Sequence, residues 1–285
     1  MEAVTEAPGL DDDEDLAMQA RGEPVRMLDP RLNGKIIGVV SYKGGVTKTR
    51  NAIELAFLLG GILVDFEHDR GSASARLGYD YRKRAGAPIV EAIVKRRTPK
   101  PMKGGAYRPD FVPGHPDLAS EQFAAQEVRD ALVSWAQEWQ RPVVPDGHPG
   151  GTEETRGIIG ASDSIVSPVT PGEDEMRALE AMVEELAGYP ILIIPSKWGR
   201  ANPDAPRDWS KRTGVKPRTR AWLERIGQRD GVTIGPAVSD YNWIPERKGI
   251  AALTSQNPVA ARIEPYDTEM RYVAKAVTEH VLASQ

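Results

Sequence analysis

The segment of this chain best suited to chemistry is the glycine-containing loop YKGGVTKT at positions 42–49. Glycines let backbone N–H groups turn toward an anion, and the loop precedes a helical pattern, whose N-terminus favours negative charge. Lys48 supplies a positive charge for a phosphate group, and Thr49 offers a hydroxyl that can bind Mg²⁺. Tyr42 and Thr47 stand where the common phosphate-loop pattern G-x-x-x-x-G-K-[ST] has its two outer glycines. The residue types therefore predict phosphate binding by a variant of that pattern.

The composition indicates a globular protein and excludes several kinds of site. The chain has 285 residues, of which 40% are hydrophobic and 27% charged, enough to bury a sizeable core. Because cysteine is absent, disulfide frameworks, thiolate zinc sites, iron–sulfur clusters and cysteine nucleophiles are excluded. No apolar run approaches the roughly 20 residues that cross a bilayer, and the N-terminus is acidic where a secretory signal is basic. We expect a cytoplasmic protein without a membrane anchor.

Short apolar runs, typical of buried strands, alternate with helical patterns along the chain. Strands are expected at 35–40, 62–65, 142–144, 164–169, 191–194 and 232–234. Apolar residues at helical spacing predict helices at 47–59, 121–139, 174–186 and 269–282. This alternation predicts an α/β fold with a mostly parallel central sheet that helices cover on both faces. The phosphate loop then lies between the first strand and the first helix.

At the loop the sequence resembles the deviant Walker ATPases of the MinD/ParA superfamily, and within them the ParA-type partition ATPases, whose loop reads K-G-G-x-x-K-[ST]. The resemblance rests on Lys43, the two glycines that follow it, Lys48 and Thr49. It implies that Lys43 is a signature lysine that reaches across a dimer interface to the nucleotide of the second subunit. The implied nucleotide-binding residues are Lys43, Gly44, Gly45, Val46, Thr47, Lys48, Thr49 and Arg50.

Two further segments are similar to motifs of this family. VDFEHDRGSAS at 64–74 resembles V-D-x-D-P-Q-G-x-x-[ST], which implies that Asp65 is the catalytic aspartate that orients the attacking water and contacts Mg²⁺ through water. Glu67 replaces one acid of that motif by another, and one residue is inserted before its glycine. VVPDGHPG at 143–150 resembles the strand end I-I-D-T-P-P, which implies that Asp146 holds Mg²⁺ through water while Thr49 binds it directly.

Two positions depart from the family pattern. Pro195 and Ser196 stand where many relatives place an asparagine that reads the adenine edge, so specificity for adenine does not follow from that contact. Arg50 stands where a small hydroxyl residue is usual. Its side chain either adds positive charge to the nucleotide site or points into solvent.

Charge is segregated along the chain, which suggests its division into two parts. Residues 1–24 hold eight acidic residues and one base, typical of a disordered segment. We therefore expect an acidic, disordered extension over 1–34 and a single P-loop ATPase domain over 35–285. Positions 196–230 hold ten bases and four acids. That stretch is either a solvated surface or a DNA-binding surface, for which the candidates are Lys211, Arg212, Lys216, Arg218, Arg220 and Arg225.

The resemblance predicts an ATPase that uses ATP and Mg²⁺, forms a homodimer on ATP and binds duplex DNA without sequence preference. It further predicts weak hydrolysis until a centromere-binding, ParB-like protein stimulates it, and therefore DNA partition by a nucleoid-associated protein. The main alternative is a MinD-like or carboxysome-type positioning ATPase that acts on a membrane or protein cargo. A third possibility is a nucleotide-binding regulator without hydrolysis, which the intact Lys43, Lys48, Thr49 and Asp65 disfavour.

Overall fold

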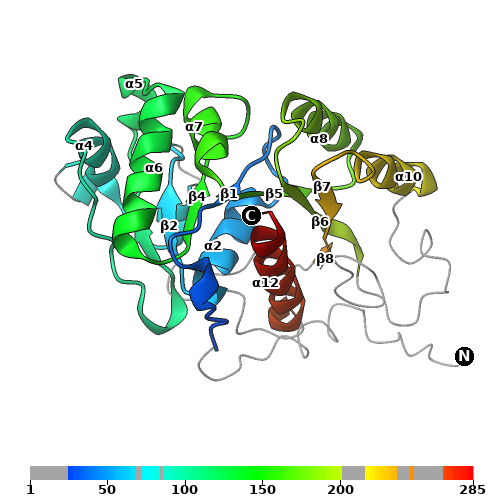
Figure 1. Ribbon diagram of the computed structural model, residues 1–285, viewed down its shortest axis with the longest axis horizontal. Coiled ribbons are helices and arrows are strands. Elements are labelled where there is room, and N and C mark those ends of the chain that lie inside the picture. Colours follow the sequence, from blue (N-terminus) through cyan, green and yellow to red (C-terminus); the bar gives the residue numbers. More distant parts are fainter. Residues whose placement is uncertain are drawn as a thin grey trace, which may run out of the picture.

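The core of the computed structural model is a parallel β-sheet whose strands run in the order β3, β2, β4, β1, β5, β6 and β7 (Figure 1). The structure describes residues 25–68, 72–83, 86–200, 216–235, 244–246 and 266–284. The strands are β1 (Ile37–Val39), β2 (Ile62–Asp65), β3 (Asp110–Val112), β4 (Val143–Asp146), β5 (Ser164–Val169), β6 (Ile191–Arg200), β7 (Val232–Ile234) and β8 (Ile244–Glu246). All neighbouring pairs are parallel, and β8 pairs with β6 outside the main order. The predicted α/β class and parallel sheet are confirmed.

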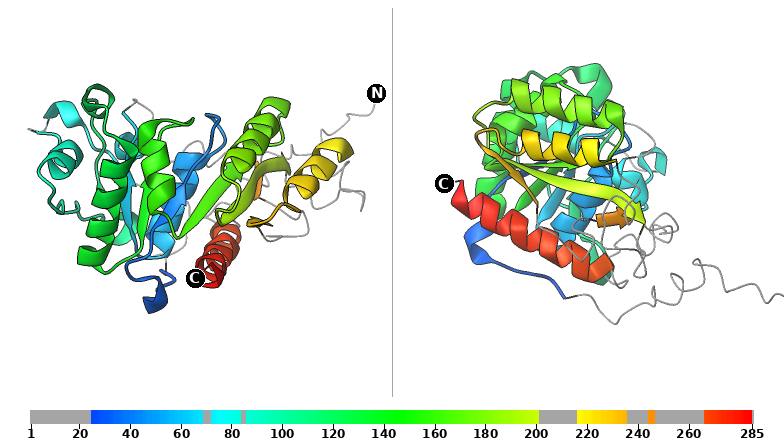
Figure 2. Two further views of the ribbon diagram at one scale, coloured as in Figure 1. Left: turned by 45° about the horizontal axis from the view of Figure 1, so that its top comes forward. Right: turned by 90° about the vertical axis from the view of Figure 1, so that its right-hand side faces the viewer.

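Helices cover both faces of the sheet, as Figures 1 and 2 show. One face carries α4 (Pro88–Val94), α6 (Ala125–Trp139), α7 (Glu153–Ala161), α8 (Glu173–Glu185) and α10 (Pro217–Ile226). The other carries α2 (Lys48–Leu58) and the C-terminal α12 (Tyr266–Ala283). Short helical turns occur in the segments outside these helices and the strands, at η1 (Pro30–Leu32), α3 (Ala73–Arg76), η2 (Tyr81–Lys83), η3 (Gly105–Tyr107) and α5 (Leu118–Glu121). Among the described helices, none combines the length and apolar character of a membrane span.

The N-terminal extension divides at residue 25. Residues 1–24, with the acidic run, lie outside the described residues. Residues 25–34 lie against the domain: Leu32 is fully buried, and the N–H of Met27 donates to the carbonyl of Leu58 at 2.6 Å. The last ten residues of the extension thus pack with the helices of one sheet face.

The helix expected at 121–139 begins later than predicted. Glu121 belongs to the short helix α5, and the next residue, Gln122, adopts a left-handed backbone conformation with φ of 47°. A left-handed residue cannot continue an α-helix, so α6 starts afresh at Ala125. Strands β3 and β8 and helices α4, α7 and α10 were not among the expected elements.

One edge of the sheet is paired beyond its last strand. Met102 forms an antiparallel bridge with Phe111 of β3, in which each residue donates its N–H to the other's carbonyl, at 2.8 and 3.0 Å. β3 therefore uses its hydrogen-bonding groups on both sides, since the opposite side pairs with β2.

Helices α6 and α7 approach closely at a glycine. A Cβ atom added at Gly157 would lie 2.6 Å from both the carbonyl oxygen of Ala125 and the Cβ of Val128. Gly160, one turn later on α7, is exposed, and its added Cβ would meet only the flexible side chain of Arg129, at 3.4 Å. The two glycines thus lie in the same helix, but only Gly157 is packed closely against a neighbouring helix.

We predict that Gly157→Ala lowers the free energy of unfolding by about 1–3 kcal/mol, because the methyl group must displace backbone at a packed interface. Gly160→Ala should raise it by up to about 1 kcal/mol, because alanine is the better helix former. Urea unfolding followed by circular dichroism measures both. Equal effects of the two substitutions would contradict the close packing of α6 on α7.

Candidate nucleotide-binding site

The phosphate loop connects β1 to α2, and its backbone turns at two left-handed residues. Gly45 has φ of 82°, and Thr47, the residue before α2, has φ of 71° and ψ of 15°. The common phosphate-loop pattern has glycine at the position of Thr47, because only glycine adopts the left-handed conformation freely. Here the side-chain amide of Asn51 donates to both the hydroxyl and the carbonyl of Thr47, each at 3.0 Å. These bonds offset part of the cost of a branched residue in the left-handed region.

Lys48 lies at the centre of a buried ion cluster. Its Nζ donates to Oε1 of Glu67 at 2.7 Å and to Oδ1 of Asp146 at 2.6 Å, and its side chain is 5% exposed. Burial opposes the charge on Lys48, but the two carboxylates outweigh that effect and hold the pKa of Lys48 above its ordinary value. Burial raises the pKa of Asp146, against the opposing influence of the Lys48 charge. The lysine therefore offsets part of the negative charge that the ends of β2 and β4 bring together.

Asp65 lies behind this cluster and is fully buried. Its carboxylate accepts from the N–H of Ser74 at 2.7 Å, from the Ser74 hydroxyl and from the N–H of Glu67 at 3.1 Å. Burial, followed by the charge of Asp146, raises the pKa of Asp65 to about 6 despite these hydrogen bonds. A carboxyl with that pKa titrates within the physiological range and can hold a proton or accept a hydrogen bond from water.

Two site residues were not predicted: Ser74, which is the last residue of the second motif, and Gly114, which lies outside the motifs. The N–H of Gly114 donates to the Ser74 hydroxyl at 2.9 Å, which fixes the serine against Asp65. A Cβ at Gly114 would lie 2.8 Å from the carbonyl oxygen of Asp65 and 2.5 Å from that of Glu67, so this position requires glycine. Its signal in the sequence is the Pro-Gly pair directly after an apolar run, which becomes informative only once that run is known to be β3.

Beside Lys48 the loop borders an open pocket of about 330 Å³. Seven predicted nucleotide-binding residues line it, namely Lys43, Gly44, Gly45, Thr47, Lys48, Thr49 and Arg50. The eighth, Val46, is buried and faces a separate crevice beneath α8. The pocket is also lined by Glu67, Arg76, Pro149 and Lys197. Arg76 and Lys197 were not predicted, because tertiary structure alone brings α3 and the end of β6 to the loop.

Arg50 is drawn into the protein rather than toward solvent. Its guanidinium forms an ion pair with Glu54, one turn later on α2, at 3.3 Å, and its side chain is 11% exposed. Arg50 lines the pocket with Arg76, and burial together with the charge of Arg50 lowers the pKa of Arg76. The two arginines therefore add positive charge along one wall.

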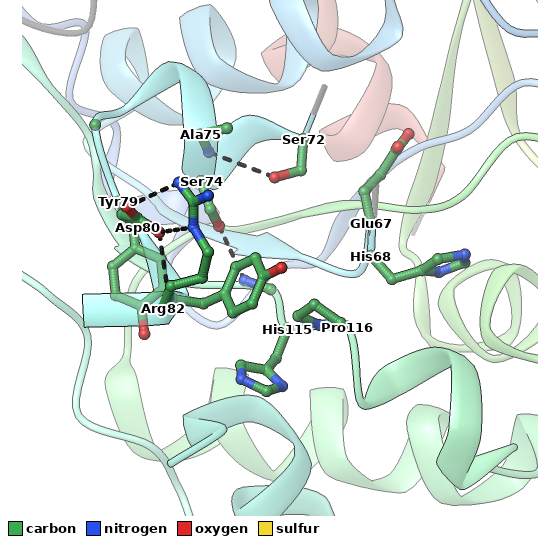
Figure 3. Close-up of a pocket in the computed structure, with 13 residues that line it drawn as sticks. Glu67, His68, Ser72, Ser74, Ala75, Tyr79, Asp80, Arg82, His115 and Pro116 are labelled. Carbon is green, nitrogen blue, oxygen red and sulfur yellow. Dashed lines mark hydrogen bonds and ion pairs between the residues drawn. The ribbon is translucent and has the colours of Figure 1, made fainter. Parts of the chain in front are cut away.

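A second pocket of about 480 Å³ adjoins the first and shares Glu67 with it. Figure 3 shows Glu67 and His68 at one side of this pocket, with Asp80 and Arg82 at the other. Arg82 is paired with Asp80 at 2.9 Å, so the opposite charges on that wall compensate each other. The phosphate-binding features are in the first pocket.

The candidate DNA-binding residues fall partly on α10. Lys211 and Arg212 lie outside the described residues. Arg218 is 73% exposed and lies 4.0 Å from Glu173, and Arg220 is paired with Glu224 at 2.7 Å. Lys216 and Arg225 are exposed, so Lys216, Arg218 and Arg225 present charge to solvent. Trp198, in the same basic stretch, is fully buried, and its indole N–H donates to the carbonyl of Val169.

The raised pKa of Asp65 predicts a pH dependence of stability. Between about pH 4 and pH 6 the folded protein holds a proton that the unfolded chain has released, so the contribution of Asp65 to stability is lost as the pH rises through 6. The free energy of unfolding of Asp65→Asn, relative to wild type, should increase by about 2 kcal/mol from pH 4 to pH 7. Urea unfolding at four pH values without nucleotide measures this change.

Asp110→Asn is the control for that experiment. The pKa of Asp110 is lowered to about 2, because hydrogen bonds from Arg141, Gly104 and Lys103 outweigh its burial. It remains largely ionised from pH 4 to pH 7, so the difference between Asp110→Asn and wild type should change by only a few tenths of a kcal/mol. A constant difference for Asp65→Asn as well would show that Asp65 is not a proton-binding group in the folded state.

Comparison with known proteins connects this arrangement to a known fold. No protein-family model matches the sequence, and no curated protein matches it either. Among solved structures, apo McdA of Cyanothece superposes with a TM-score of 0.66 and 18% identity, over 87% of this chain and 99% of that one. ParA of pNOB8 gives 0.63 and 15% identity over 88% and 99%, and the cell division ATPase MinD of Pyrococcus furiosus gives 0.60 and 18% over 88% and 100%. The chain therefore has the P-loop α/β fold that ParA, MinD and McdA share.

Proposed function

We propose that this chain is an ATP-dependent DNA partition ATPase. The observation that carries the proposal is the phosphate loop at the end of β1, with Lys48 held between Glu67 and Asp146 beside an open pocket. Structures of the same fold include an ATP complex of McdA and an AMPPNP complex of a putative plasmid partition protein from Borrelia burgdorferi. On this proposal the pocket binds the phosphates of ATP. Lys48 then interacts with a phosphate group as well as with Glu67 and Asp146.

Asp65 and Lys43 have separate roles in the proposed hydrolysis. Asp65, fixed by Ser74, accepts a hydrogen bond from the attacking water and thereby orients it. Lys43 lies at the pocket rim with its side chain 45% exposed and its Nζ 4.0 Å from Asp174. This exposure leaves Lys43 accessible to a second subunit, so we propose that it reaches the nucleotide of the partner in an ATP-dependent dimer.

The residues around Asp146 fit the Mg²⁺ that accompanies ATP. Oδ2 of Asp146 is buried and has no hydrogen-bond partner among the described residues. The side chain of Thr49 acts on the same carboxyl group, whose pKa it lowers. Oxygen donors of this kind are those that Mg²⁺ prefers. Thr49 would hold the ion directly, and Asp146 and Asp65 through water. Bound there, Mg²⁺ would neutralise charge on the phosphates.

The surface of α10 supports the proposed binding of DNA. Arg218 and Arg225 are exposed and lie seven positions apart, which places them on one side of the helix. ParA of pNOB8 has been solved bound to nonspecific DNA, with a TM-score of 0.56 to this chain. We propose that the ATP dimer binds duplex DNA through this surface at the nucleoid, and that a centromere-binding protein stimulates hydrolysis and release.

The alternative is a positioning ATPase that moves a protein or membrane cargo. Its support is that MinD and McdA superpose on this chain as well as ParA does. The alternative shares the nucleotide site with the partition proposal. DNA binding by the ATP form therefore distinguishes the two.

We predict that Lys48→Ala and Lys43→Ala fail at different steps. Lys48→Ala should lose most ATP binding, because it leaves Glu67 and Asp146 without their cation and removes the charge that meets the phosphates. Lys43→Ala should bind ATP as tightly as wild type but remain monomeric and hydrolyse it slowly. Titration with a fluorescent ATP analogue and light scattering separate the two effects. A Lys43→Ala protein that still dimerises on ATP would refute the role across the interface.

We predict ATP-dependent binding of random duplex DNA that weakens steeply with salt, since each phosphate contact adds about 0.9 to the slope of log affinity against log salt. Arg218→Glu with Arg225→Glu should abolish retention of DNA on a filter and leave ATP-dependent dimerisation intact. The control, Lys95→Glu with Lys100→Glu, makes the same change in net charge at and beyond the end of α4 and should bind DNA far better. Dimers that do not retain DNA at low salt would favour the positioning alternative.

A further inference from the structure

Two histidines at the ends of adjacent strands stack against each other. His68 follows β2 and His148 follows β4, two strands that pair with Asp65 directly opposite Asp146. The imidazole rings have centroids 4.7 Å apart and an angle of 4° between their planes. Both side chains are partly buried. The rings thus join the two segments that follow the predicted catalytic and metal-binding aspartates.

Each histidine is adjacent to a residue that lines the nucleotide pocket. Glu67 precedes His68 and binds Lys48, whereas Pro149 follows His148. The two pocket residues come from different strand ends, and the histidine stack spans the distance between those ends. A change in the spacing of the rings would therefore move two walls of the pocket relative to each other.

The segment after β4 is anchored to the rest of the site. The carbonyl of His148 accepts from the hydroxyl of Thr155 on α7 at 2.9 Å. The N–H of Gly150 donates to the carbonyl of Ser41, at the start of the phosphate loop, at 3.2 Å. Through the stack, the segment that carries Glu67 is joined to a segment already fixed on α7 and the loop.

His68 does not take part in the ion pair of the neighbouring pocket. Figure 3 shows its ring pointing away from Asp80 and Arg82, although the residue borders that pocket. Its described ring contact is with His148. The partner ring also has a polar contact, since Nδ1 of His148 lies 3.0 Å from the carbonyl oxygen of Pro149.

We propose that His68 and His148 are positioning residues for ATP hydrolysis, because their stacked rings hold Glu67 and Pro149 in place around the terminal phosphate. The inference rests on the proposed ATPase function. Binding of ATP depends mainly on the loop backbone and Lys48, whereas the stack joins the segments after β2 and β4. Hydrolysis depends on the relative position of groups from β2 and β4, and small displacements of such groups lower the rate strongly. The stack should therefore affect turnover more than affinity.

The test compares two replacements of His148 that keep different features of the ring. His148→Phe keeps a planar ring that can stack, and His148→Asn keeps a polar group near Pro149 but removes the ring. An aromatic pair of this geometry predicts a fall in kcat of about two- to tenfold for His148→Asn, with the Kd for ATP within about twofold of wild type. His148→Phe should keep both values within about twofold. His115→Asn is the control, because that ring packs on Tyr81 rather than on the nucleotide site.

A double-mutant cycle tests whether the two rings act as a unit. His68→Asn should lower kcat as His148→Asn does, and the double variant should be no slower than the slower single variant, because either change removes the stack. Thermal unfolding confirms that each variant is folded, and His68→Asn serves if His148→Asn is not.

Three results would overturn the inference. Equal loss of kcat in His148→Phe and His148→Asn would assign the role to the polar contact. Additive losses in the double variant would show independent roles. An unchanged kcat in both single Asn variants would show that the stack does not position the site. If wild type binds ATP but these variants are unaffected, only the inference fails, whereas a wild type that neither binds nor hydrolyses ATP removes the proposed function and the inference with it.

Discussion

The interaction on which the site depends is the pairing of one buried ammonium group with two buried carboxylates. Lys48 bonds to Glu67 and Asp146, and Asp65 lies directly behind them, so acids outnumber the central cation. Removing one partner from such a cluster leaves charge in a medium of low polarity, which typically costs about 3–5 kcal/mol. The raised pKa of Asp65 is part of the same balance, because partial protonation reduces the excess of negative charge. The arrangement is thus poised for additional cations and for a ligand that brings them.

The parallel sheet makes this cluster possible. In a parallel sheet the carboxyl ends of all strands lie at one edge, so acids at the ends of β2 and β4 meet a lysine that follows β1 between helix and sheet. Register is as important as topology, since Asp65 pairs directly with Asp146. Close approach of the segment after β3 adds the last support, because Gly114 admits the carbonyl of Asp65 and orients Ser74. A register shift of one residue in any of these strands would turn its acidic side chain to the other face of the sheet and break up the cluster.

How much could be predicted from sequence depended on whether a feature is local. The positions of the phosphate loop and of the aspartates at the ends of β2 and β4 follow from residues adjacent in the chain, so motifs and the apolar pattern were enough to predict them. β3 begins with the charged Asp110 and offers only two consecutive apolar residues, so its position was missed together with that of Gly114. Arg76 and Lys197 reach the pocket through the folding of distant segments, and no local signal marks them. Helix α10 was missed because the surrounding stretch is dominated by charge, proline and glycine rather than by apolar spacing.

The antiparallel bridge between Met102 and β3 bears on how copies of this protein could assemble. An edge strand with free N–H and carbonyl groups can template another chain, and proteins suppress this by covering or pairing such edges. Because Phe111 exchanges both of its hydrogen bonds with Met102, the β3 edge presents no ladder for a further strand. Filaments or arrays of this protein cannot grow by extension of the sheet at that side. Copies of this protein that meet at that side must therefore contact each other through side chains rather than through a shared sheet.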